Sequence, residues 1–287
     1  MQQIPETDLI LNPDGSIYHL NLLPEDIADT VITVGDPDRV AEVSRYFDQI
    51  DFKKGKREFI THTGWITNKR ITVISTGIGT DNIDIVFNEL DALVNIDFTT
   101  RLIKEKLTSL NIIRIGTSGS LHADIPMDSI LVSDYGLGFD ALMNYYQSEN
   151  TEQETGLLKK LNTHFVDSKV PHPYLTAGSS TLLKKIGYGL PSGITATAPG
   201  FYAPQGRAVR AKNAVPGFLN QLKSFEFQEQ RITNLEMETA GIYALAKALG
   251  HEALSVNAIL ASRAELKFSK NPQQTVDRAI KLVLERL

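Results

Sequence analysis

Short runs of apolar residues alternate with amphipathic stretches along most of this chain. Apolar runs that end at glycine, serine or another turn former are typical of buried strands, whereas apolar positions every three or four residues indicate one face of a helix. The expected strands cover residues 30–34, 59–66, 70–75, 111–115, 129–133, 174–177, 232–235 and 254–261. The expected helices cover residues 37–47, 81–96, 155–167, 236–249 and 273–286. Residues 187–220 are rich in glycine, proline and alanine, which predicts a long active-site segment.

This alternation predicts an α/β protein with a mixed, mainly parallel central sheet between two layers of helices. We find no linker, repeat or low-complexity tract, so residues 1–287 are expected to form a single domain. Ligands of such sheets collect at the carboxyl ends of the strands. Residues that directly follow strands are therefore the first candidates for chemistry.

The first such segment runs from Gly35 to Arg39. Gly35 ends a strand, and Pro37 opens the next helix, whose free N–H groups form an anion site. Arg39 stands in the first helical turn, where a cation opposes the helix dipole. A bound phosphate would explain that placement, and an ordinary strand-to-helix turn is the alternative.

The second segment begins with Arg114, an arginine inside an otherwise apolar strand. A buried cation without a partner is costly, so either a protein carboxylate or a ligand anion must face it. The residues after the strand, 116–119, combine two glycines with Thr117 and Ser118 and could form an anion-binding concavity of N–H and hydroxyl groups. The sequence does not decide whether the partner of Arg114 is a protein carboxylate or a ligand anion.

The third segment places Glu236 and Glu238 on either side of Met237, where a strand is expected to turn into a helix. Two carboxylates can accept hydrogen bonds from the vicinal hydroxyls of a ribose, and they can equally cap the helix. The six histidines of the chain show no metal-binding spacing.

The fourth segment, residues 201–207, combines a carboxamide with a guanidinium. Gln205 offers an acceptor and two donors, and Arg207 offers a rigid fork of donors. Together they match the edge of a uracil ring, with Phe201 and Tyr202 as an apolar or stacking wall. A surface loop with a solvated arginine is the alternative.

Composition and charge exclude several classes of binding partner and of chemistry. The net charge of −5 and the pI of about 5.7 leave no general basic field for nucleic acid. The chain has no cysteine, which excludes a disulfide framework and a thiolate nucleophile. Residues 1–6 lack a signal-peptide pattern, and no apolar run approaches the ~20 residues of a membrane span, so we expect a soluble, cytoplasmic protein. The glycines of residues 35–39 and 75–80 do not follow the dinucleotide-binding order.

Taken in order along the chain, these four segments resemble the nucleoside phosphorylase-I family, from Tyr18 to the terminal helix. The resemblance implies a nucleoside phosphorylase-like fold and the reversible phosphorolysis of uridine, and also of deoxyuridine, to uracil and (deoxy)ribose 1-phosphate in pyrimidine salvage. Inorganic phosphate would be a co-substrate, and no organic cofactor is implied. A purine nucleoside phosphorylase, a nucleosidase and a non-catalytic nucleoside-binding relative remain as alternatives.

The resemblance also implies a role for each matching residue. Phosphate would be held by Gly35, Arg39, Arg57, Arg114 and Thr117, and ribose by His19, Glu236, Met237 and Glu238. The base would be held by Phe201, Gln205, Arg207 and Arg263. Catalysis, as charge stabilisation and alignment, would fall to Arg39, Arg57, Arg114, Gln205 and Arg207.

Two further expectations follow from the resemblance. His19 and Arg57 match residues that reach the neighbouring subunit's site, which implies sites shared across a dimer interface and a hexamer built as a trimer of dimers. Some relatives bind a potassium ion near the positions of Glu58, Ile78 and Asn82. Asn82 stands here in place of a serine, which argues against that ion.

Overall fold

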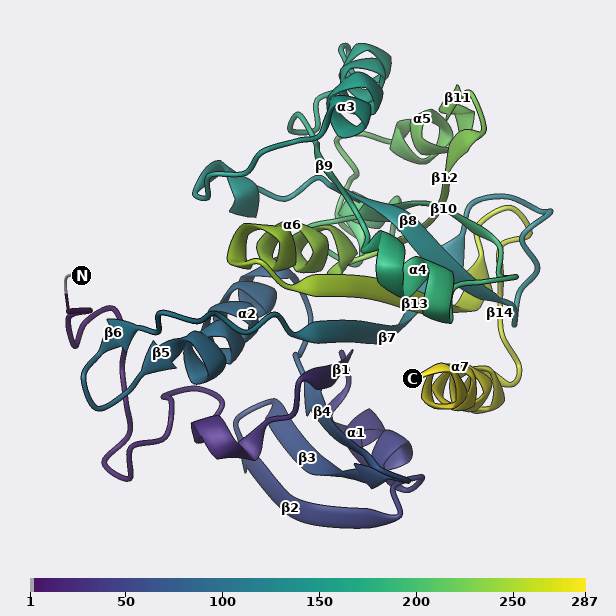
Figure 1. The fold of residues 1–287 in the computed structure, drawn as a ribbon. Coiled ribbons are helices and arrows are strands. Elements are labelled where there is room, and N and C mark those ends of the chain that lie inside the picture. The colour runs from purple at the N-terminus through teal and green to yellow at the C-terminus, as the bar shows by residue number, and fades with distance from the viewer. Residues whose placement is uncertain (1–2) are drawn as a thin grey trace. The chain divides into compact units, whose positions relative to one another are not determined.

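The computed structural model describes residues 3–287, which fall into two compact units (Figure 1). The first unit comprises the chain up to residue 113 together with residues 249–252, and the second comprises residues 114–248 and 253–287. The single domain expected over residues 1–287 stays a prediction. Residues 1 and 2, the start of the segment examined for a signal peptide, lie outside the described residues. No helix among residues 3–287 is long and apolar enough to cross a membrane.

The first unit is built on four longer strands and two longer helices. The strands are β1 (Thr30–Val34), β2 (Gln49–Lys56), β3 (Phe59–Ile66) and β4 (Lys69–Ser75), in the order β1-β4-β3-β2. The helices are α1 (Pro37–Ser44) and α2 (Thr80–Asn95), and the short elements are η1 (Pro24–Asp26), β5 (Ile96–Asp97) and β6 (Leu102–Ile103). β1 pairs with β4 in parallel, and the other two pairings are antiparallel, which confirms the hairpin predicted over residues 59–75.

β2 was missed because lysines occupy its inner face. Its side chains alternate between exposed and half-buried positions, as a strand requires. Lys54 and Lys56 take half-buried positions, where Lys54 pairs with Asp26 and Lys56 lies over the Tyr18 ring, 4.2 Å from its centroid. Their polar ends conceal the alternation from a hydrophobicity pattern.

The second unit is organised around a ring of strands. Its strands are β7 (Asn111–Ser120), β8 (Ile130–Gly138), β9 (Tyr174–Ala177), β10 (Ser192–Thr197), β11 (Glu226–Phe227), β12 (Gln230–Glu236), β13 (Glu252–Ser262) and β14 (Lys267–Phe268). They follow the order β11-β12-β10-β8-β13-β7, and β12 also pairs with β7, which closes five of these strands on themselves. β10 is parallel to β8 and β12, whereas β13–β8 and β12–β7 are antiparallel, so the sheet is mixed.

The helices of the second unit correct several predicted boundaries. They are α3 (Glu152–His164), α4 (Ser180–Ile186), α5 (Phe218–Ser224), α6 (Thr239–Leu249) and α7 (Pro272–Arg286), with the short turns η2 (Leu142–Asn144) and η3 (Ala203–Gln205). The helix expected from residue 236 begins at Thr239, because Glu236 is the last residue of β12. In the first unit, α1 ends at Ser44 rather than at residue 47.

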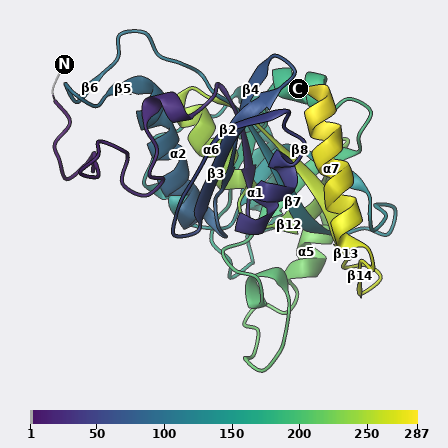
Figure 2. The ribbon, with the colours of Figure 1, turned by 90° about the horizontal axis from the view of Figure 1, so that it is seen from below.

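The segment 187–220 contains β10 and the start of α5, neither of which was predicted. The small residues of β10 give no run of branched apolar side chains, so its strand character depends on pairing with β8 and β12. The chain that remains irregular leads through η3 into α5 (Figure 2). Phe139 packs edge to face against Phe165 and Phe218, with ring centroids 5.3 and 5.0 Å apart, and these rings belong to the core cluster that joins α3 and α5 to the sheet.

Candidate active site

Arg114 lies on β7, and its guanidinium is buried among polar groups of β12, of the bend between β12 and α6, and of β13. Its Nη2 donates to Glu238 Oε2 at 2.7 Å and lies 2.9 Å from Glu236 Oε2. Its Nη1 donates to Asn257 Oδ1 at 3.2 Å and to Ser255 Oγ at 3.4 Å. The partner that the sequence required is therefore a pair of protein carboxylates, although this finding does not test a phosphate contact. We call these five residues the Arg114 cluster.

Burial alone would lower the pKa of Arg114, but the carboxylates of Glu236 and Glu238 outweigh it and hold that pKa above its ordinary value. The guanidinium folds back over its own strand, so that a Cβ on Gly116 would overlap Nη1. Glycine at position 116 therefore makes room for a buried arginine.

Residues 116–119 are not the concave loop that we expected after Arg114. They continue β7, and Gly119 is in register with Leu235 of β12. Thr117 is half-buried on this strand, whereas Ser118 is buried and accepts a hydrogen bond from Asn234 Nδ2 at 2.8 Å. Small residues permit the close approach of β7 and β12, and strand pairing uses the backbone N–H groups that an anion site would need.

The two carboxylates of the third segment have different surroundings. Glu236 Oε1 accepts from Thr197 Oγ1 at 2.7 Å, and both Glu236 oxygens lie 3.0–3.1 Å from the Thr239 N–H at the start of α6. Glu236 therefore caps this helix, as the alternative interpretation predicted. Glu238 is also buried and contacts Arg114, and Met237 between them is half-buried. The geometry gives Glu236 a structural role in addition to its predicted contact with ribose.

The fourth segment is held together locally around Arg207. Its Nη1 donates to Gln205 Oε1 at 2.6 Å and to the Phe201 carbonyl at 2.7 Å, and its guanidinium lies 3.8 Å from the centroid of the Phe201 ring. Arg263 joins from β13–β14, where its Nη2 donates to the Gln205 carbonyl at 3.1 Å. Burial, and then the charge of Arg263, lower the pKa of Arg207. We call these four residues the base segment.

The Gln205 carboxamide has a defined orientation because Arg207 can only donate. Its oxygen faces the guanidinium and keeps a second lone pair, and its amide nitrogen has no hydrogen bond within residues 3–287. Gln205 is 3% exposed, whereas Phe201 is 51% exposed. A ligand at this segment would meet an amide edge backed by a cation, which is the pattern predicted for uracil recognition.

Three of the predicted phosphate-binding residues, Gly35, Arg39 and Arg57, belong to the first unit. Asp36 caps α1 through its contact with the Asp38 N–H at 3.0 Å, and Arg39 is half-buried in the first turn, beside Gly35 at the end of β1. Arg57 stands exposed at the tip of the β2–β3 hairpin with a left-handed backbone (φ 56°). A residue other than glycine adopts this conformation at a cost of about 1 kcal/mol or more, which is often found at functional sites.

The residues considered for a cation surround Gly77. The side chains of Glu58 and Asn82 both reach the position that a Cβ on Gly77 would occupy, and Ile78 is 67% exposed. Within residues 3–287, no three His, Cys, Asp or Glu side chains form a group that could hold a metal ion. A potassium ion here stays a prediction.

His19 contacts a residue that the sequence did not single out. Its ring Nδ1 lies 2.6 Å from Glu89 Oε1 on α2. Glu89 and Asn257 are both far in sequence from their partners, and no local motif indicated them. For Asn257, the signal was a polar residue at a buried position of the mostly apolar strand β13.

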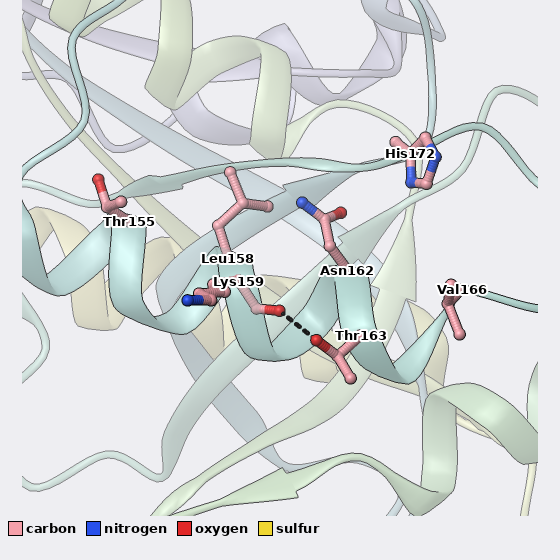
Figure 3. A pocket seen from close by; sticks show the side chains of 7 residues that line it. All are labelled: Thr155, Leu158, Lys159, Asn162, Thr163, Val166 and His172. Carbon is pink, nitrogen blue, oxygen red and sulfur yellow. Dashed lines mark hydrogen bonds between the residues drawn. The ribbon is translucent and has the colours of Figure 1, made fainter.

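An open pocket of about 520 Å³ lies along α3 and contains none of the predicted site residues. It is lined by Thr155, Leu158, Lys159, Asn162, Thr163, Val166 and His172 (Figure 3). Most of these side chains come from one helix, α3 (Figure 3).

The model of the phosphorylase superfamily matches residues 29–287 of this chain. The chain therefore belongs to that family. Uridine phosphorylase of Thermococcus kodakarensis is 28% identical over 276 residues, which cover 95% of this chain and 88% of the relative. A purine nucleoside phosphorylase of the DeoD type from Buchnera aphidicola is 26% identical over 273 residues, covering 94% and 98%. The crystal structure of a Trypanosoma brucei nucleoside phosphorylase that shows uridine phosphorylase activity superimposes with a TM-score of 0.87 at 30% identity, covering 98% and 99% of the two chains.

Proposed function

We propose that this chain catalyses the reversible phosphorolysis of uridine, and of deoxyuridine, to uracil and the corresponding pentose 1-phosphate. The observation that carries the proposal is the base segment, in which Arg207 orients the carboxamide of Gln205. The similarity to uridine phosphorylases over nearly the whole chain supports it. The setting that we propose is pyrimidine nucleoside salvage in the cytoplasm, which a chain without cysteine fits.

The base segment matches the hydrogen-bonding edge of uracil. The Gln205 amide nitrogen can donate to a ring carbonyl, while its oxygen accepts from N3–H with the remaining lone pair. Arg207 places positive charge beside the carbonyl oxygens, on which negative charge develops as the glycosidic bond breaks. Cytidine would meet Arg207 with an amino group, donor against donor, and would be rejected.

Ribose and phosphate are assigned to the remaining residues. Glu238, with Glu236 and Met237, would accept from the 2′- and 3′-hydroxyls, and His19 would contact the 5′-hydroxyl. Gly35, Arg39, Arg57, Arg114 and Thr117 would contact phosphate. Arg114 is already paired with two carboxylates, so its phosphate contact would use donor capacity beyond the bonds described above. Each of these assigned contacts can be tested by a single substitution of the residue concerned.

In the proposed reaction, phosphate oxygen attacks C1′ as the C1′–N1 bond breaks, through an oxocarbenium-like state comparable to that of glycoside cleavage. The electron pair of the broken bond stays on the uracil ring and is delocalised onto its oxygens. The protein positions phosphate and stabilises both charges, which are the main sources of rate enhancement here. The reaction uses inorganic phosphate as co-substrate and requires no organic cofactor.

The deciding experiment follows uracil release from uridine by absorbance, with and without inorganic phosphate, and tests inosine in parallel. Phosphate-dependent uracil release is expected. Release without phosphate would instead identify a nucleosidase, and hypoxanthine release from inosine alone would identify a purine phosphorylase. Titration of uracil and phosphate by calorimetry separates catalysis from binding without turnover.

We also propose that sites are shared between subunits of a dimer, within a trimer of dimers. The exposed, left-handed Arg57 at a hairpin tip supports this, because a residue held at such a cost is suited to reach a neighbouring chain. His19→Ala and Arg57→Ala, each inactive alone, are expected to regain activity when mixed under conditions of subunit exchange. Exchange without recovery would contradict a shared site.

A further inference from the structure

Glu89 on α2 contacts three polar groups of the segment at His19, namely two backbone N–H groups and the imidazole ring. Its two carboxylate oxygens accept from the His19 N–H, both at 3.0 Å, and Oε2 accepts from the Leu20 N–H at 2.8 Å. Its Oε1 lies 2.6 Å from the imidazole Nδ1. The Glu89 side chain is 13% exposed and the His19 side chain 25%, so the carboxylate is the more buried partner.

These contacts determine which ring nitrogen of His19 carries the proton. A carboxylate can only accept, so the short contact places the proton of the neutral ring on Nδ1 and leaves the lone pair on Nε2. The Tyr18 ring meets the imidazole edge to face at 4.8 Å and limits its rotation. The partly exposed ring therefore presents a hydrogen-bond acceptor supported by a negative charge.

We propose that Glu89 is a positioning residue that presents His19 Nε2 to a hydroxyl donor and thereby selects nucleosides with a free 5′-hydroxyl. This inference rests on the proposed function. Glu236 and Glu238 account there for the 2′- and 3′-hydroxyls, and Gln205 and Arg207 for the base edge, so the 5′-hydroxyl is the donor that remains. A 5′-phosphate would bring acceptor oxygens and negative charge against a lone pair that Glu89 supports, and it would be rejected.

The test replaces Glu89 with glutamine, which keeps the size of the side chain. The amide oxygen can still accept from the two backbone N–H groups, while the amide nitrogen faces Nδ1 as a donor and moves the ring proton to Nε2. We expect kcat/KM for uridine to fall about tenfold, the change that corresponds to one lost hydrogen bond. Cleavage of 5′-deoxyuridine, which lacks the hydroxyl, is expected to change less than about twofold.

Inhibition by uridine 5′-phosphate tests the acceptor at His19 Nε2 directly. In Glu89→Gln an N–H replaces the lone pair on Nε2, so the inhibition constant of this nucleotide is expected to fall. Glu105→Gln, an exposed glutamate of the same unit, is the matched control and should leave both substrates unchanged. In a His19→Ala background, Glu89→Gln should cause no further change in uridine affinity measured by calorimetry, since Glu89 acts through the ring.

Equal losses for uridine and 5′-deoxyuridine would overturn the proposal and leave Glu89 as a tie between α2 and residues 19–20. No loss for uridine would overturn it as well. Nitrogen-15 NMR of the neutral imidazole reads the tautomer without any turnover. A wild-type ring protonated on Nδ1 that changes to Nε2 in Glu89→Gln supports the positioning role even if uridine proves not to be the substrate, and an Nε2 proton in the wild type contradicts it.

Discussion

Arg114 and Arg207 are arginines of the same unit that are held in opposite ways. Arg114 is 5% exposed and bonds to residues at least 122 positions away, namely Glu236, Glu238, Ser255 and Asn257. Arg207 is half-buried and bonds to residues within six positions of itself. The Arg114 cluster is thus part of the core that unites several strands, whereas the base segment is a local structure on that core. Substitutions in the Arg114 cluster should therefore lower stability, whereas substitutions in the base segment should impair recognition of the base.

The largest effect is expected for Arg114→Leu. Removal of the guanidinium leaves two buried carboxylates beside each other, and the loss of one partner from a buried ion pair costs about 3–5 kcal/mol. Urea denaturation should show that loss in the free energy of unfolding, and uridine cleavage should disappear with it. A variant of wild-type stability would mean that solvent or another group already balances these charges.

Arg207→Ala is expected to reduce uridine cleavage strongly while the protein stays folded. Loss of one group that stabilises developing negative charge lowers kcat by roughly 10²–10³-fold. The free energy of unfolding should change by less than about 1 kcal/mol, since no buried charge loses a partner. Calorimetric titration of phosphate provides the control, because equal losses in phosphate affinity and uridine cleavage would remove the base-recognition role.

Gly116→Ala tests the packing of the Arg114 cluster without changing its charges. The added methyl overlaps Arg114 Nη1, so the guanidinium must shift and its bonds to Asn257 and Ser255 must weaken. Overpacking of this kind costs about 1–3 kcal/mol. Thermal unfolding measures the cost, with Gly156→Ala, a site with open space around its Cβ, as the control. Similar effects at both positions would show that the guanidinium is not confined.

The smallest effect is expected for Phe201→Leu, which removes the ring beneath the Arg207 guanidinium. A cation–π contact at an exposed site contributes about 0.5–1 kcal/mol, so kcat/KM for uridine should fall roughly two- to fivefold. A tenfold or greater loss, with unchanged stability, would instead indicate that the ring stacks on the base itself.

Most strands and helices followed from hydrophobic periodicity, since each needs only its own residues to show which face is buried. Where the prediction was wrong, an element depended on its neighbours. β10 has one branched apolar residue, Ile194, and is paired on both sides, with β8 and β12. The residues after Arg114 form a strand rather than a loop because β12 closes the ring of strands against them.

The candidate site divides in the same way. The base segment could be predicted because its hydrogen bonds span at most six residues, apart from the one that Arg263 supplies. The capping role of Glu236 was also predictable, since the N–H groups that it accepts belong to the next three residues. Glu89 could not be predicted, because seventy residues separate it from His19 and nothing in its own helix distinguishes it.

The sequence by itself determined that this chain alternates strands and helices, that Arg114 needs a partner and that residues 201–207 combine an amide with a guanidinium. The tertiary structure alone decided that Arg114 pairs with Glu236 and Glu238 and that Glu89 faces the Nδ1 atom of His19. The physical reason is that a buried charge or an oriented ring specifies the chemistry of its partner. The position of that partner in the chain depends on which strands and helices come together.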